Sequence, residues 1–147
     1  MTAFQPQDPQ FEQRVRGSFA RQKAMATIGA LLARVEAGAC EIELPFREDL
    51  TQQKGFVHGG IVGMIADSAA GYAAYSLMPA GCSLVTVEYK MNILTPGRGA
   101  LVAKGQVLKP GRTLTVARAE VYSRDGGHVA SMQQTLMMLP GRPDTPE

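Results

Sequence analysis

The chain has 147 residues, a length typical of one domain. Of these residues 45% are hydrophobic and 19% are charged, which is the composition of a folded chain. Its 15 basic and 13 acidic residues give a net charge of +2, and the basic residues form no block, so we predict no nucleic-acid partner. Cys40 and Cys82 have no second thiol or histidine cluster close by, which argues against a disulfide framework and predicts no metal site.

The N-terminal residues are polar, contain two prolines and have no apolar run. They cannot serve as a secretory signal, so we expect a cytoplasmic protein. We predict a flexible arm over residues 1–10, a single domain over 11–139 and a disordered tail over 140–147. After the arm, apolar residues recur at intervals of three or four, which predicts a leading helix with a break near Gly29.

Two contrasting patterns follow the leading helix. Residues 32–46 alternate in polarity and end at Pro45 and a charged stretch, which predicts a first strand. Residues 55–79 are nearly continuous in Gly, Ala and apolar side chains and contain one carboxylate, Asp67, which predicts a long helix buried on most of its surface. This length also matches a membrane span, but a mid-helix carboxylate is costly in lipid, so we predict no membrane partner.

The remainder of the chain has a period of two and is divided by turns that contain Gly or Pro. It predicts four strands in hairpin succession, a meander, over residues 84–94, 100–108, 114–123 and 128–139. A helix that is apolar on nearly all sides needs cover on each of them, and a sheet of this size has one face to bury. We therefore expect an α+β fold in which a curved antiparallel sheet wraps round a long central helix.

The start of that helix reads His58-Gly59-Gly60. Glycines let a ligand approach the backbone closely, and the first turn of a helix presents unpaired N–H groups at the positive end of its dipole. Such a helix end can polarise a carbonyl and hold the oxyanion that forms upon attack. The alternative interpretation is that the two glycines merely permit a tight turn into the helix.

Asp67 is the only charged residue between His58 and Pro79, and a carboxylate among apolar neighbours is costly unless it is paired or useful. It is either a general base or nucleophile, or a structural Asp bonded to Ser68 or to a neighbouring strand. Nine residues of helix correspond to about 13.5 Å and about 900°, which places Asp67 opposite His58 and well below it. If both act on one substrate, Asp67 must reach the glycine end of a second copy's helix, which implies a twofold dimer with two shared sites.

Several features occur together along the chain: Gln52, His58-Gly59-Gly60 six residues later, Asp67, the run Thr86-Val87-Glu88-Tyr89 and the turn Lys109-Pro110-Gly111-Arg112-Thr113-Leu114. This combination, over residues 32–139, resembles the hotdog-fold acyl-CoA thioesterases of the phenylacetate-degradation, or PaaI-like, group. The resemblance implies hydrolysis of small aryl- or medium-chain acyl-CoA. It also implies homodimers that pair into a homotetramer, and no cofactor, because coenzyme A is part of the substrate.

The resemblance also implies a role for each matching residue. The Gly59 N–H would polarise the thioester carbonyl, while Asp67 of a second subunit would activate water or attack directly. Gln52 would orient water or substrate, and Thr86 stands where relatives carry Ser or Thr near the carboxylate. His58, together with Gly60, would support the start of the helix.

Three further residues are expected to bind substrate. Arg112, which follows Gly111 in the matching turn, is a candidate for the phosphates of coenzyme A, although a solvated side chain is the plainer interpretation. Met64 and Tyr72 are candidates for the acyl pocket, although side chains of this kind are more often part of the core.

Two other functions remain open. A dehydratase or hydratase on the same fold would need a His and an acid near the acyl chain. The run Phe56-Val57-His58-Gly59 has neither a Gly directly before the His nor a Phe-Pro after it. A non-catalytic acyl-CoA-binding protein would lose the acid or add a DNA-binding module, whereas Asp67 is present here and no such module is. The sequence therefore favours a thioesterase.

Overall fold

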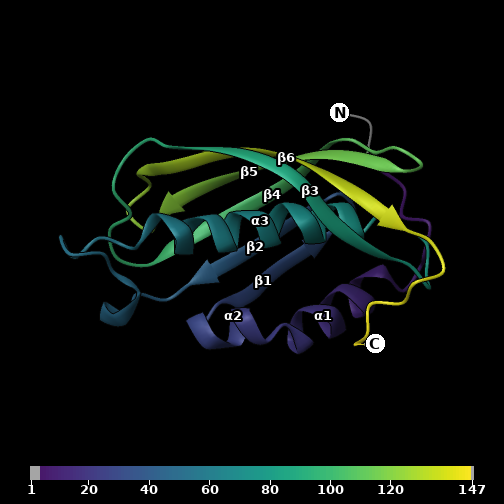
Figure 1. Ribbon diagram of the computed structural model, residues 1–147, viewed down its shortest axis with the longest axis horizontal. Coiled ribbons are helices and arrows are strands. Elements are labelled where there is room, and N and C mark those ends of the chain that lie inside the picture. The colour runs from purple at the N-terminus through teal and green to yellow at the C-terminus, as the bar shows by residue number, and fades with distance from the viewer. Residues whose placement is uncertain (1–3, 147) are drawn as a thin grey trace.

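The computed structural model describes residues 4–146 (Figure 1). A long helix, α3, lies in the concave side of a curved six-stranded sheet, and two shorter helices, α1 and α2, lie beside strand β1. The elements in chain order are α1 (Phe11–Arg21), α2 (Lys23–Ile28), β1 (Leu31–Glu36), β2 (Ala39–Leu44), a short 3-10 helix (Glu48–Leu50), α3 (Gly59–Tyr75), β3 (Ser83–Ile93), β4 (Leu101–Lys109), β5 (Leu114–Ser123) and β6 (His128–Leu139).

Helix α3 is buried along most of its length and forms the core with the inner face of the sheet. Its small side chains let the sheet approach its backbone. At Gly105 on β4 a Cβ atom would lie 2.1 Å from the carbonyl oxygen of Ala69. The expected α+β architecture, an antiparallel sheet wrapped round a central helix, is confirmed. The helix is shorter than the predicted 55–79 because Val57 is already engaged in a bridge with Gly97.

The prediction of one strand over residues 32–46 is wrong, because this segment forms the hairpin of β1 and β2. Glu36 pairs with Ala39, so only two residues make the turn. Gly38 has a φ of +79°, a left-handed conformation that a residue without a Cβ adopts without strain. The polarity alternates on both sides of this turn, which hides the break in the sequence.

The predicted four-strand meander is also wrong in part. Strands β4, β5 and β6 are consecutive neighbours, but β3 pairs with β6 and β4 pairs with β2, in the order β1-β2-β4-β5-β6-β3. The connection after β3 is not a hairpin: Val57 N–H donates to Gly97 O at 2.9 Å, which ties this connection to the segment before α3. The chain thus crosses to the other half of the sheet, and β3 is left as an edge strand.

The leading helix breaks earlier than predicted. The break lies at Gln22, between α1 and α2, whereas Gly29 ends α2 in a left-handed conformation with a φ of +76°. The break turns the chain, so that Gln22 contacts Ser68 on α3.

Within the predicted N-terminal arm, Asp8 is buried and forms an ion pair with Arg14, with Oδ2 and Nε 2.8 Å apart. A hydrogen bond from the backbone N–H of Gln10 and the interaction with Arg14 lower the pKa of this carboxyl below its usual value. The Arg14 guanidinium also donates to the carbonyl of Met78 at 2.7 Å. These contacts fix the segment before α1 to the residues that follow α3.

Within the predicted tail, the carbonyl of Asp144 accepts a hydrogen bond of 2.7 Å from Arg21 on α1. The C-terminal end accordingly lies next to α1 in Figure 1. Residues 1–3 of the predicted arm and residue 147 of the predicted tail lie outside the described residues. None of the helices within 4–146 is long and apolar enough to cross a bilayer.

The contact between β4 and α3 gives a test of the packing. Replacement of Gly105 by Ala should lower the free energy of unfolding by about 1–3 kcal/mol or more, because the added Cβ meets backbone atoms of Ala69 that cannot rotate away. The same change at Gly17, in α1, should raise it by roughly 0.5–1 kcal/mol, because the nearest atom there is an Arg21 side-chain nitrogen at 3.6 Å. Chemical denaturation of both variants measures the two effects, and equal stability of both would contradict the packing described.

Candidate functional site

The start of α3 is organised by His58, which is the N-cap residue. Its Nδ1 accepts a hydrogen bond of 2.9 Å from the backbone N–H of Gly60. No atom of residues 4–146 accepts a hydrogen bond from the N–H of Gly59. Apart from its chain neighbours and the nearby backbone of α3, no described atom lies within 4 Å of the position that a Cβ of Gly59 would occupy. The Gly59 N–H is therefore a free donor at the positive end of a 17-residue helix.

The Gly59 backbone opens into a pocket that we call the helix-tip pocket. It is lined by Gln52, Lys54, Phe56, Val57, Gly59, Val62, Ile93, Leu94, Thr95, Pro96 and Gly97. The side-chain oxygen of Gln52 accepts a hydrogen bond from the N–H of Lys54 within its own loop. The guanidinium of Arg98 lies 4.6 Å from the centre of the Phe56 ring, a cation–π contact at the side of this pocket.

Asp67 lies further along α3, on the side that faces β3, and is half-buried. Its Oδ1 accepts two hydrogen bonds: 2.8 Å from Oγ1 of Thr86 on β3 and 3.1 Å from Nε2 of Gln134 on β6. Its Oδ2 has no hydrogen-bond or ion-pair partner among residues 4–146. A bulge between Thr86 and Glu88 shifts the register of β3 just after the threonine, so that Thr86 points toward α3.

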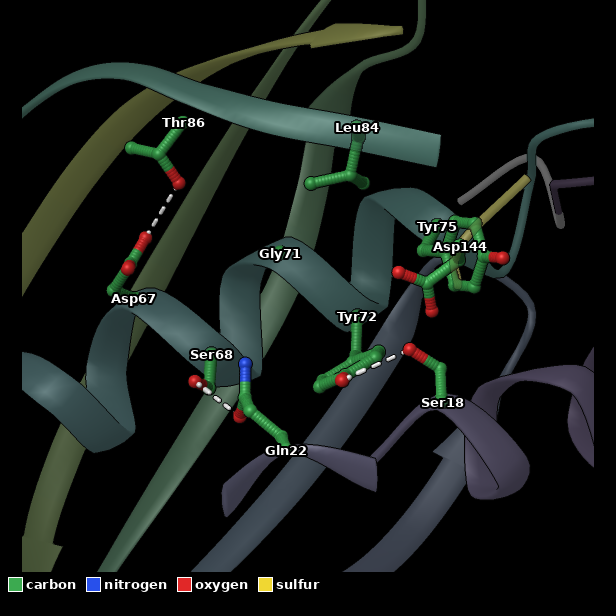
Figure 2. Close-up of a pocket in the computed structure, with 10 residues that line it drawn as sticks. All are labelled: Ser18, Gln22, Asp67, Ser68, Gly71, Tyr72, Tyr75, Leu84, Thr86 and Asp144. Atoms are coloured by element: carbon green, nitrogen blue, oxygen red, sulfur yellow. Dashed lines mark hydrogen bonds between the residues drawn. The ribbon is translucent and has the colours of Figure 1, made fainter. Parts of the chain in front are cut away.

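A second pocket, which we call the carboxylate pocket, lies beside Asp67 (Figure 2). It is lined by Ser18, Gln22, Asp67, Ser68, Gly71, Tyr72, Tyr75, Leu84, Thr86 and Asp144. Two polar pairs line its wall: the Ser18 and Tyr72 hydroxyls are 3.1 Å apart, and Ser68 donates to Gln22 at 3.3 Å. Burial raises the pKa of Tyr72 to about 12 and also raises the pKa of Tyr75, so both phenols are neutral near pH 7.

The structure distributes the predicted catalytic residues between these two pockets. Asp67 and Thr86 are in contact in the carboxylate pocket, whereas Gly59 and Gln52 share the helix-tip pocket. Eight residues of helix, about 12 Å of rise, separate Gly59 from Asp67. Asp67 therefore does not share a pocket with the Gly59 of its own chain.

The predicted substrate-binding residues are also dispersed. Tyr72 lines the carboxylate pocket. Met64 is half-buried against the core, and Arg112 is exposed in the connection between β4 and β5; neither lines either of the two pockets. Across residues 4–146 no group of three His, Cys, Asp or Glu side chains is placed to hold a metal ion.

Several residues of the carboxylate pocket were not predicted from the sequence. Ser18, Gln22 and Asp144 come from α1, the α1–α2 break and the C-terminal segment, and no local pattern marks them. Gln134 has a sequence signal: it falls on the inward, otherwise apolar positions of β6, between Met132 and Leu136. A buried polar residue among apolar inward positions is unusual, so the strand register is the signal that could have identified Gln134.

Comparison with known proteins agrees with this geometry. Residues 54–130 match the sequence profile of the Thioesterase superfamily. The chain belongs to that superfamily. A crystal structure of a thioesterase family protein from Silicibacter pomeroyi is 48% identical, with a TM-score of 0.87 over 89% of this chain and 99% of that one. The PaaI protein of Escherichia coli, from the phenylacetic acid degradation operon, has the same fold, with a TM-score of 0.85 at 19% identity over 93% of this chain and 99% of that one.

A further relative of this chain is a proposed esterase of Saccharolobus solfataricus, which is 36% identical over 93 residues. The match covers 63% of this chain and 66% of that protein, so this thioesterase-superfamily chain spans just under two thirds of the curated relative. The resemblance seen in the sequence, to hotdog-fold thioesterases of the PaaI-like group, is confirmed by the superfamily match and by the fold.

Proposed function

We propose that the protein is an acyl-CoA thioesterase that hydrolyses small aryl- or medium-chain acyl-CoA. The observation that carries this proposal is the carboxylate of Asp67, which is held at Oδ1 by two donors and opens into a pocket with Oδ2 unpaired among the described residues. Such a carboxylate can take a proton from water as general base or attack the acyl carbon itself. In the first case water adds to the acyl carbon as it gives its proton to Asp67, the acyl–sulfur bond breaks, and the departing thiolate of coenzyme A takes up a proton as the acid is released. In the second case the acyl group passes to Asp67 as an anhydride while the thiolate departs and takes up a proton, and water then hydrolyses the anhydride to release the acid.

The N–H of Gly59 supplies the second element of the proposed reaction. A backbone donor at a helix start, free of other partners within residues 4–146, can bind the carbonyl oxygen as negative charge develops on it. In this proposal Gln52, in the same pocket, orients water or substrate, and Thr86 holds Asp67. His58 supports the helix start by accepting from Gly60.

The edge strand β3 supports a homodimer in which two chains share each site. Within residues 4–146 it pairs with β6 alone, and it exposes the apolar side chains of Val85, Val87 and Ile93. Thr86, near one end of β3, contacts Asp67, and Ile93, at the other end, lines the helix-tip pocket. If two β3 strands pair antiparallel about a twofold axis near their middle, the Asp67 of one chain comes beside the helix tip of its partner.

The size of the carboxylate pocket supports the same arrangement. Its volume is about 190 Å³, whereas complete small-molecule sites enclose roughly 300–1,000 Å³. A second subunit would supply the missing wall. The rings of Tyr72 and Tyr75 and the side chain of Leu84 would contact a small aryl or medium-length acyl group.

The location of the coenzyme A phosphates is a separate part of the proposal. Arg112 is the residue predicted from the sequence for this role, and its exposed guanidinium is free to bind an anion. Lys54 lines the helix-tip pocket and Arg98 contacts the ring of Phe56, one of its lining residues, so these two side chains are further candidates. The homotetramer, the cytoplasmic location and independence of any cofactor stay predictions from the sequence.

Replacement of Asp67 by Asn tests the catalytic carboxylate. The wild-type protein should release free thiol from a panel of aryl- and medium-chain acyl-CoA substrates, measured with a thiol reagent. The Asp67→Asn variant should lose about 10²–10⁴-fold in kcat, because the amide can neither accept a proton nor attack the carbonyl. Its melting temperature and its elution as an oligomer should be unchanged. Full activity in this variant would exclude the proposed role, and binding of acyl-CoA without hydrolysis by the wild type would favour a non-catalytic binding protein.

Replacement of Gly59 by Pro deletes the proposed oxyanion donor and little else. Proline is favoured at the first helical position, the preceding residue His58 has an extended ψ of 137°, and the space beside Gly59 is open. The kcat should fall about 10²–10³-fold, as when one oxyanion-hole donor is removed, while the melting temperature is kept. Gly59→Ala, which adds a side-chain carbon but retains the N–H, is the matched control. Equal activity of the Pro and Ala variants would contradict a role for this N–H.

Mixing the two inactive variants tests the shared site. In a heterodimer of Asp67→Asn and Gly59→Pro chains, one site carries both defects and the other carries none. Equal mixing with free subunit exchange should therefore restore roughly a quarter of the wild-type activity. If exchange is demonstrated with differently tagged chains and no activity returns, the site is not shared between subunits.

A further inference from the structure

Gln134 is a fully buried polar residue that faces α3 from β6. Its Nε2 lies 3.1 Å from Oδ1 of Asp67 and 3.4 Å from the backbone oxygen of the same residue. Both partners are acceptors, so the NH2 group and not the carbonyl of the amide must face them. The orientation of the Gln134 side chain is therefore fixed by Asp67.

The other end of this amide is not used for bonding. Oε1 of Gln134 is buried and has no hydrogen-bond partner among residues 4–146. A buried amide oxygen without a partner loses its hydration without compensation. An apolar side chain of similar length, such as Met, would fill the same space and avoid that cost. Packing alone therefore does not account for a glutamine at this position, whereas its bond to Asp67 does.

Thr86 and Gln134 act on the same oxygen from two adjacent strands. β3 and β6 are paired, with Thr86 opposite Leu136 and Tyr89 opposite Gln134. Hydrogen bonds to an ionised carboxylate are stronger than those between neutral groups. Both donors are directed at Oδ1, so that oxygen is anchored. The carboxylate cannot rotate about its Cβ–Cγ bond without losing both hydrogen bonds.

We propose that Gln134 is a positioning residue of the thioesterase, which anchors Oδ1 of Asp67 so that Oδ2 is the oxygen that reacts. This inference rests on the proposed function. It specifies which of the two carboxylate oxygens takes the proton from water or attacks the acyl carbon. Gln134 acts only through Asp67 and does not touch the substrate.

Replacement of Gln134 by Met tests this role. The kcat should fall about ten- to a hundredfold, as expected for loss of one hydrogen bond to a charged group, while KM changes by less than about twofold. The melting temperature should not fall, because the variant also removes the unpaired Oε1. Met132→Leu, a change on the same inward face of β6, is the control and should keep both kcat and stability. A residue with a merely structural role would give the opposite result, a lower melting temperature at an unchanged kcat, and that result would overturn the inference.

Two further measurements separate this inference from the proposed function. In an Asp67→Ala background, Gln134→Met should cause no additional loss of residual activity, because the group through which it acts is gone; a loss of the same factor would overturn the positioning role. A crystal structure of Gln134→Met should show the Asp67 carboxylate rotated or in two conformers, and an unchanged single conformer would also overturn it. If the crystal structure of Gln134→Met shows Asp67 displaced but the wild-type protein releases no thiol from acyl-CoA, the result would refute the proposed function alone.

Discussion

The structure depends on one constraint, the burial of a helix that has apolar or very small side chains on almost every side. Helix α3 cannot be left at a surface, and a flat sheet would cover only one side of it. The sheet therefore curves around it, and β4 comes so close that Gly105 touches the backbone at Ala69. This close contact is possible because neither partner carries a bulky side chain at the point of approach.

The same burial determines where chemistry can take place. Two of the less buried parts of α3 carry polar groups: its start, where the N–H of Gly59 is free among the described residues, and the side that faces β3, where Asp67 is half-buried. Because β3 runs along α3 as an edge strand, it borders both of these parts, at Ile93 and at Thr86. In the proposed homodimer, the pairing of two such edges would bring together a donor and a carboxylate that lie about 12 Å apart along one helix.

The sequence predicted the central helix and the outer sheet because their signals are local. The run of Gly and Ala around Asp67 and the period-two strands follow directly from the side chains that must be buried. The order of the strands was not predictable in this way, because β3 resembles the first strand of a meander until Gly97 is seen bonded to Val57. The turn at Gly38 was missed because alternation continues through it. For the site, Asp67 and Thr86 were predicted together and do meet, whereas Gln134 depends on strand register and Ser18 on how α1 folds back.

Part of the wall of the carboxylate pocket comes from the two ends of the chain, while the rest of it comes from α3 and β3 in the middle. The segment shared with the superfamily, residues 54–130, contains Gly59, Asp67 and Thr86, but Ser18 and Asp144 lie outside it. Substitutions at Ser18 or Asp144 can therefore change the shape of the pocket without replacing Gly59, Asp67 or Thr86. In this architecture, part of the pocket wall can diverge between relatives while these three groups are inherited together.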